Sequence, residues 1–192
     1  MTTKDLIQEL SSKTAQSLEF VTQHFKRLSN NQRNWKKDAY SWSINETLAH
    51  LNAFATYYHA TFLYKFEITK FKNPSDEFIS SPLGRSAWKS MKLGNAKNVK
   101  RKFNAIRTMN PRFNEELVTE SSVEDFEKNI HQMTEIIERA ATVSLRKVKI
   151  PISFSKIVRL RLGDALLYVV YHNERHVQQA LNLINHPQFP EA

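Results

Sequence analysis

Two of the seven histidines lie one helical turn apart near the C-terminus, in the stretch YHNERHVQQ at positions 171–179. In a helix, His172 and His176 project from the same face, so both imidazoles can reach one metal ion. Pairs at this spacing also occur by chance on helix surfaces. The stretch alone therefore leaves two interpretations open, an ordinary helix face and half of a metal site.

The pair does not match the half-site of a zinc protease. In the H-E-x-x-H motif, a glutamate directly follows the first histidine and serves as the general base. Here Asn173 occupies that position, and Glu174 lies about 200° around the helix from His172. We therefore exclude a metalloprotease of this type.

A third ligand has to come from another part of the chain, and His50 is the best candidate. It lies among Leu48, Leu51 and Phe54 on the apolar face of a predicted helix. A buried imidazole needs partners for its ring nitrogens, so a hydrogen-bonded core histidine and a metal ligand both fit. His59 lies about 180° around the same helix. The remaining histidines lack a partner at ligand spacing and are expected at the surface or in packing contacts: His24, His131 and His186.

The elements that carry these histidines are predicted to be long amphipathic helices. Only three Gly and six Pro interrupt 192 residues, of which 41% are hydrophobic. Apolar positions recur at helical spacing in four stretches. These stretches are residues 3–29, residues 44 to about 71, residues from about 122 to 141, and residues 162–183. Four such helices predict an all-α four-helix bundle.

Capping signals mark where the helices begin. Ser43 and Glu46 form an S-x-x-E capping box, which places the start of the second helix at Ile44. A similar Ser-x-x-acid pattern at Ser121 precedes the third helix. Glu46 also lies one turn before His50, so a carboxylate that supports the metal site is an alternative role. Capping is the favoured interpretation.

Irregular segments separate the helices. Residues from about 73 to 120 form a long basic excursion between the second and third helices, with at most a short helix at SAWKSMKLG, positions 86–94. Segments of this length are usually functional or partly mobile. Residues 143–151 alternate imperfectly between apolar and polar, which predicts an extended arm that ends at Pro151.

The basic charge is concentrated in one part of the chain. Residues 64–112 hold twelve Lys or Arg against three Asp or Glu, a surplus that equals the net charge of +9. Such a surface can attract nucleic acid, a membrane surface or an anionic ligand. No stretch resembles a helix-turn-helix or another groove-reading module, so specific nucleic-acid binding is not expected.

Composition argues against several other classes. The chain has no cysteine, which excludes disulfides, thiolate metal sites and cysteine nucleophiles. The N-terminal stretch MTTKDLIQEL lacks the apolar region of a signal peptide. The longest apolar run, LLYVVY at positions 166–171, is far shorter than a bilayer span. We expect a cytoplasmic protein with no membrane partner.

Two motifs resemble one known family. WSINETLAHL at positions 42–51 is similar to the N-terminal signature of the DinB/YfiT-like metalloenzymes, and residues 159–184 carry their C-terminal H-x-x-R-H-x-x-Q signature. The order and separation of the motifs also fit, so the resemblance covers essentially the whole chain as one domain, 1–192. It implies an up-down-down-up four-helix bundle with a metal site formed by His50, His172 and His176.

The resemblance also implies a function. Three histidines that leave a coordination position open predict a divalent-metal-dependent enzyme, with Zn, Ni or Fe as the ion. The ion would activate water in a hydrolase, or a low-molecular-weight thiol in an S-transferase, since some relatives are thiol-dependent transferases. The alternative is a non-catalytic, stress-related binding or interaction module with a residual metal site. A small-molecule substrate and a homodimer are expected.

Several further side chains have open roles. Gln179 is predicted either to hydrogen-bond near His176 or to face solvent. Four aromatic residues could line a pocket, although packing in the core is the commoner role: Trp42, Tyr57, Tyr58 and Trp88. Three basic residues of the excursion are candidates for contact with an anionic thiol or substrate: Lys100, Arg101 and Lys102.

Overall fold

The computed structural model describes residues 1–94 and 104–191. Four long helices form its body: α1 (Thr3–Phe20), α3 (Ile44–Ile68), α5 (Ser122–Ala140) and α6 (Leu162–Ile184). Shorter elements connect them: a π-helical turn (Val21–Phe25), α2 (Asn30–Asn34), α4 (Pro82–Met91), two 3-10 turns (Arg107–Met109 and Glu115–Leu117), β1 (Lys149–Ile152) and β2 (Ser155–Arg161). The predicted all-α fold is confirmed, with one small hairpin added to it.

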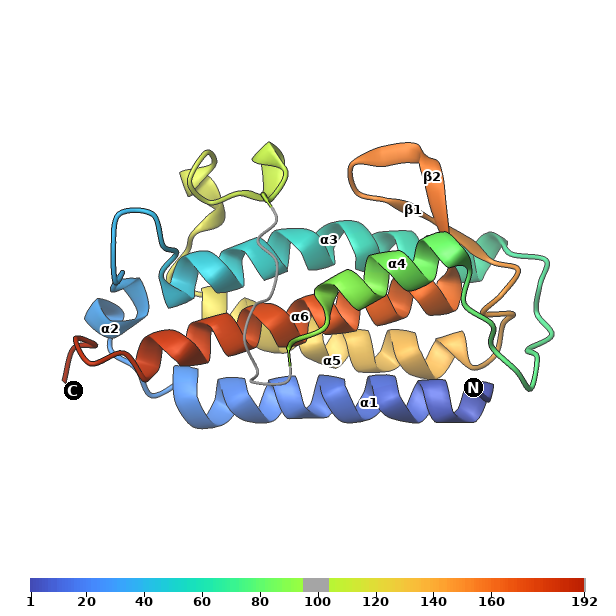
Figure 1. Ribbon diagram of the computed structural model, residues 1–192, viewed down its shortest axis with the longest axis horizontal. Coiled ribbons are helices and arrows are strands. Elements are labelled where there is room, and N and C mark those ends of the chain that lie inside the picture. Colours follow the sequence, from blue (N-terminus) through green and yellow to red (C-terminus); the bar gives the residue numbers. More distant parts are fainter. Residues whose placement is uncertain (95–103, 192) are drawn as a thin grey trace.

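The four long helices pack in an up-down-down-up arrangement (Figure 1). Helices α1 and α6 run in one direction, and α3 and α5 run in the other. Both α1 and α3 pack against α5 and α6. The contact between α3 and α6 brings the two histidine motifs of the sequence into one part of the core.

Side-chain caps fix the first turns of α1 and α3. The Ser43 Oγ accepts a hydrogen bond from the Glu46 N–H (3.1 Å), and the Glu46 carboxylate accepts one from the Ser43 N–H (2.8 Å). This is the predicted capping box, and α3 begins at Ile44 as expected. Thr2 and Asp5 cap α1 in the same way.

Two predicted helix ends and one predicted helix cap were wrong. Helix α1 ends at Phe20 and passes into the π-helical turn, and Ser29 then caps the separate helix α2 instead of ending the first helix. Helix α3 stops at Ile68 rather than near residue 71. Helix α5 has no side-chain cap, because the Ser121 hydroxyl donates to the Asp125 carboxylate (2.7 Å).

The excursion between α3 and α5 is more regular than the sequence suggests. Helix α4 begins at Pro82, ahead of the predicted short helix, and packs along α6. The start of α4 is held by the fully buried Asp164 of α6, which accepts hydrogen bonds from the Ser81 N–H (3.0 Å) and the Ser81 Oγ (2.9 Å). Only glycine fits at position 84, because a Cβ there would collide with the Asp164 side chain.

The predicted extended arm is the first strand of an antiparallel hairpin. Strand β1 continues one residue past Pro151 and pairs with β2, with Lys149 opposite Arg161 and Pro151 opposite Arg159. The sequence prediction missed β2 and ended the arm at the proline. A two-stranded ladder tolerates proline because each strand has an unpaired edge.

The core consists of two clusters of buried apolar side chains. One lies toward the hairpin end and includes Phe54, Tyr58 and Tyr171; the other lies toward the opposite end and includes Leu48 and Val177. Tyr58 is fully buried, so packing is its role, as the sequence favoured. On both α3 and α6, the histidines of the two motifs lie where the residues of one cluster give way to those of the other.

Two sequence-level expectations about the outside of the molecule can be placed at this point. Within residues 1–94 and 104–191, no helix combines the length and apolar character needed to cross a membrane. The three basic candidates for anion contact lie outside the described residues: Lys100, Arg101 and Lys102.

Candidate metal site

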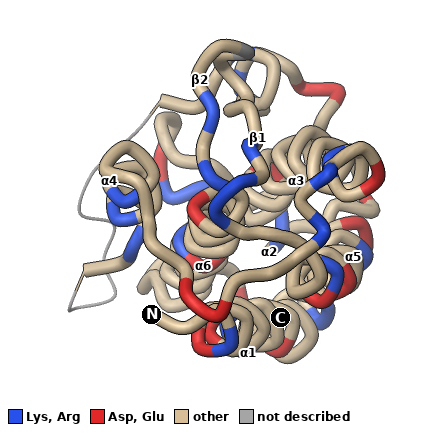
Figure 2. The backbone as a smooth tube through the Cα atoms, turned by 90° about the vertical axis from the view of Figure 1, so that its right-hand side faces the viewer, with Lys and Arg blue, Asp and Glu red and all other residues tan. Residues whose placement is uncertain are grey.

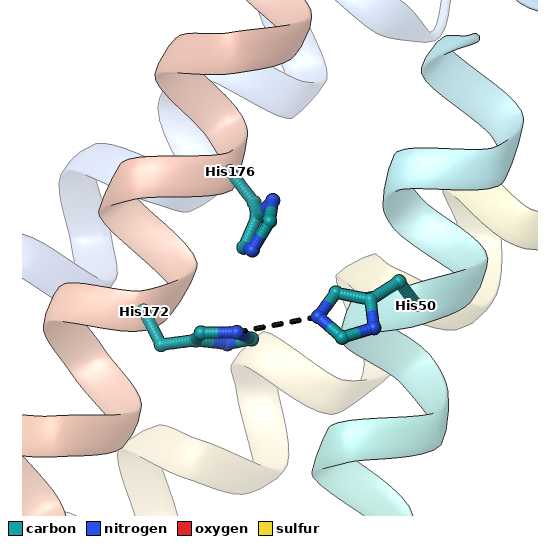
Figure 3. A group of neighbouring side chains, drawn as sticks. All are labelled: His50, His172 and His176. Atoms are coloured by element: carbon teal, nitrogen blue, oxygen red, sulfur yellow. Dashed lines mark hydrogen bonds between the residues drawn. The ribbon is translucent and has the colours of Figure 1, made fainter. Parts of the chain in front are cut away.

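Three imidazoles from two helices meet in the core (Figure 3). His50 comes from α3, and His172 and His176 come from successive turns of α6. One nitrogen of each ring lies within 4.8 Å of one nitrogen of each of the other two rings. Such a group could hold a metal ion. The structure thus brings together the three residues that the sequence motifs singled out.

Two of the rings are oriented by oxygen acceptors outside the cluster. The His50 Nδ1 lies 2.6 Å from the Met109 carbonyl oxygen, and the His176 Nδ1 lies 3.1 Å from the Gln179 Oε1. An oxygen acceptor requires a proton on the facing Nδ1, so the Nε2 of each ring carries a lone pair. Ligand histidines in metalloproteins are commonly held this way, which fixes the tautomer for binding through Nε2.

The third ring has no such support. The His172 Nε2 lies 3.2 Å from the His50 Nε2 (Figure 3), and its buried Nδ1 has no hydrogen-bond partner among the described residues. A proton on the His172 Nε2 would satisfy the short contact and leave Nδ1 as a bare acceptor. A proton on Nδ1 would leave two lone pairs facing each other.

A cation bound between the two Nε2 atoms would account for their contact. Ligand nitrogens about 2.0–2.1 Å from a tetrahedral ion lie roughly 3.3 Å apart. The measured separation of the His50 and His172 Nε2 atoms, 3.2 Å, is close to that value. The donor set and this spacing therefore fit a divalent ion, with His176 completing the group.

The surroundings keep all three imidazoles neutral, which is the form that binds metal. Burial lowers the pKa of His50, against the opposing effect of the Met109 carbonyl. Burial, together with the other site histidines and Arg175, holds the pKa values of His172 and His176 well below the usual value. No carboxylate of the described residues contributes to these shifts.

Aromatic side chains form the walls of the cluster. The Phe54 ring stacks on His172 with centroids 4.0 Å apart, and Tyr168 lies beyond it, 6.3 Å from His172. On the other side, the Trp42 ring lies 5.0 Å from His50 and 6.0 Å from His176. These walls explain why His50 and His172 are only 4% and 6% exposed.

Trp42 also borders a pocket that opens to the surface. Its partly exposed indole lines this pocket with side chains of both charges, among them Lys36, Glu46, Arg112 and Glu115. The indole therefore contacts the histidine cluster on one side and the pocket on the other. The pocket is therefore linked to His50 and His176 through the Trp42 ring.

The polar neighbours predicted near the site divide into two groups. Gln179 does hydrogen-bond to His176, one of its two predicted roles. Glu46 does not support the cluster, because its carboxylate is used by the Ser43 N–H and the Lys36 ammonium (2.6 Å). Glu174 faces α1, where it forms an ion pair with Lys13 (2.6 Å), which agrees with its exclusion as a catalytic base.

The other histidines stay outside the cluster. His59 is buried on α3 and its Nδ1 pairs with the Gln132 Oε1 of α5 (2.8 Å). His24 and His131 are exposed, and the half-buried His186 packs against Trp35, with ring centroids 5.4 Å apart. The sequence anticipated this separation from the angular position of His59.

Sequence reasoning missed two contributors. Met109 acts through its backbone carbonyl, so no side-chain pattern could have marked it. Phe54 was assigned to the apolar face of the helix, which is correct, but its stacking on His172 depends on how α3 and α6 pack. Its position four residues after His50 was the only available signal, since such residues share a helix face.

Comparison with known proteins identifies one family. A model of the DinB superfamily matches residues 14–180, which include all three histidines of the cluster. Searches of curated proteins and of solved structures returned no match.

Proposed function

Because the chain belongs to the DinB superfamily, we propose that it is a divalent-metal-dependent enzyme whose ion is bound by His50, His172 and His176. The observation that carries the proposal is the convergence of three imidazoles, two of them buried, with one ring nitrogen of each within 4.8 Å of the others and with lowered pKa values. The superfamily match covers residues 14–180 and therefore spans all three histidines.

The ligand set favours an open, reactive site. Structural zinc sites usually have four protein ligands, whereas three histidines leave a position for water or substrate. When bound, the ion supplies a Lewis acid that lowers the pKa of a ligand in that position. Zn, Ni and Fe all accept imidazole, and the donor set does not separate them.

The residues of this chain have three tasks at such a site. Met109 and Gln179 accept hydrogen bonds from the Nδ1 atoms of His50 and His176, which leaves the Nε2 lone pair of each ring for the ion. Phe54 and Trp42 exclude bulk water from two sides of the cluster. The pocket beside Trp42 is the place where we expect a small substrate to approach.

Thiol activation is favoured over water activation at this site. In residues 1–94 and 104–191, no carboxylate contributes to the pKa shifts of the three histidines. Glu46, which lines the neighbouring pocket, already accepts hydrogen bonds from the Ser43 N–H and the Lys36 ammonium. An ordinary thiol has a pKa near 8.5, whereas bulk water has a pKa of about 15.7. A thiol therefore needs far less assistance, and we propose an S-transferase that uses a low-molecular-weight thiol.

A non-catalytic module remains the alternative function. In that case the histidine cluster would bind metal for structural reasons, or not at all. The buried stack of Phe54 on His172 is compatible with either role. Metal content and activity separate the two functions.

Metal analysis tests the first step. Protein purified without a histidine tag or chelator should contain about one divalent ion per chain, and His50→Ala or His176→Ala should lose it. His59→Gln is the matched control, because His59 is also buried on α3 but lies outside the cluster. Substoichiometric metal in the wild type that does not change in the two site variants would reject the metal site.

An activity screen tests the second step. The metal-loaded protein is assayed with low-molecular-weight thiols plus electrophiles, and separately with esters and amides. Thiol consumption that requires His50 supports the transferase, and hydrolysis without thiol supports the water-activating enzyme. A metal-loaded protein inactive in both assays favours the binding module.

A further inference from the structure

The β1–β2 hairpin projects from one end of the bundle and plays no part in the proposed site. It stands above α3 and α4, clear of the four-helix body (Figure 1). Two hydrogen bonds anchor its turn: the Tyr57 hydroxyl donates to the Ile152 carbonyl (3.1 Å), and the Ser153 N–H donates to the Tyr58 hydroxyl (3.3 Å). The hairpin therefore has a defined position from which it can contact another surface.

The hairpin is strongly basic. From residue 149 to residue 161 the chain has four Lys or Arg and no Asp or Glu. The overall charge count placed the surplus in residues 64–112 because acidic helices elsewhere balance the hairpin. Figure 2 looks at this end of the molecule and shows Lys and Arg segments on both strands.

Lys149, Arg159 and Arg161 lie close together on the two strands and form no ion pair with a carboxylate of the described residues. Lys149 lies opposite Arg161 in the strand register, an arrangement of like charges that destabilises a sheet. Burial and then the charge of Arg161 lower the pKa of Lys149, while Asp164 acts in the other direction.

The outer part of the hairpin is apolar. Phe154, in the turn, is 64% exposed, and Ile157, on β2, is 91% exposed. Large apolar side chains at the tip of a projecting element, next to clustered cations, form a pattern found in surfaces that bind membranes. Apolar groups enter the boundary of the acyl chains, and Lys or Arg contact anionic head groups.

We propose that this hairpin docks on an anionic lipid surface. A narrow convex element offers little area for a protein partner, since standard protein interfaces bury about 1,600 Å². Nucleic acid would satisfy the cations but would leave Ile157 in water. We expected no membrane partner from the sequence because no segment is long enough to cross a bilayer, but a peripheral contact does not require such a segment.

Vesicle sedimentation tests the proposal. The wild type should bind vesicles that mix phosphatidylglycerol with phosphatidylcholine, and binding should weaken with salt and be absent on pure phosphatidylcholine. Arg159→Glu and Ile157→Ser should each weaken binding at least about fivefold. Lys128→Glu and Tyr40→Ser, at exposed sites away from the hairpin, are the matched controls and should bind like the wild type.

A fluorescent variant distinguishes lipid from other polyanions. Phe154→Trp should show a blue shift of emission with phosphatidylglycerol vesicles, relative to the wild type, and no shift with heparin or duplex DNA. No binding to anionic vesicles, equal binding to neutral ones, or tighter binding to DNA without a blue shift would overturn the proposal. His50→Gln should bind vesicles normally, so the two proposals fail independently.

Discussion

Helix α3 carries two buried histidines in different surroundings. His50 and His59 are 4% and 3% exposed, and burial lowers the pKa of both. In each, Nδ1 is held by an oxygen, from Met109 for His50 and from Gln132 for His59. The Nε2 of His50 meets two more imidazoles, whereas the Nε2 of His59 is buried with no hydrogen-bond partner among the described residues.

The comparison separates what makes a histidine structural from what makes it part of a site. Burial, a lowered pKa and an oriented ring are shared, so none of these properties identifies a metal ligand. The difference is convergence: α6 supplies His172 and His176 opposite His50, and α5 supplies an amide opposite His59. A property that changes when His50 is replaced, but not when His59 is replaced, therefore depends on the cluster.

The largest difference should appear in metal-linked stability. Zinc at about one hundred times its dissociation constant stabilises a folded protein by about 2.7 kcal/mol, which raises Tm by about 5–10 °C at this size. His50→Gln should abolish this rise, and His59→Gln should retain it. The measurement is thermal unfolding with zinc and with chelator, and an equal rise in both variants would show that the ion binds elsewhere.

A second difference should appear in the pH dependence of the metal-free protein. The pKa of each site histidine is lower in the folded state than in the unfolded state. As the pH falls below about 6.5, the unfolded chain binds protons that the folded chain does not, so the free energy of unfolding decreases. Each histidine contributes a slope of up to about 1.4 kcal/mol per pH unit.

Variants at the three site histidines and at His59 allow their contributions to this slope to be compared. Replacing His50, His172 and His176 together by Gln should remove up to three such contributions, whereas His59→Gln should remove up to one. Urea unfolding between about pH 6.5 and pH 5 in the presence of chelator measures the slopes. A slope in the triple variant equal to that of the wild type would mean that the cluster is protonated in the folded state.

The smallest difference concerns the two glutamines. Gln179→Ala removes the acceptor for the His176 Nδ1 and should weaken metal affinity about tenfold, as loss of such supporting groups typically does. Gln132→Ala removes the corresponding acceptor of His59, so it should leave affinity unchanged and lower stability by about 1 kcal/mol. Metal titration and urea unfolding of both variants test the contrast.

Local sequence signals were sufficient for the helices that carry the site. Ser43 and Glu46 marked the start of α3 correctly, since a capping box depends on four consecutive residues. The start of α6 at Leu162 and its end near residue 183 also followed from local patterns. The three histidines were brought together by matching two motifs, because no spacing within one motif relates residue 50 to residue 172.

Tertiary contacts account for what the sequence did not reveal. The start of α4 depends on Asp164, which lies more than 80 residues away from Ser81. Strand β2 was missed because Pro151 suggested an end, and its pairing with Arg159 is visible only once both strands are placed. The Met109 carbonyl could belong to any residue type, so its role depends on the path of the excursion.

The His50–His172 contact joins positions 122 residues apart in the chain. Closing so long a loop is a late event for any folding chain, because the entropy of the intervening segment is lost first. His172 and His176 are close as soon as α6 forms, but the third nitrogen arrives only when α3 docks. The moment at which a refolding chain acquires its full affinity for metal would thus time the docking of α3 on α6.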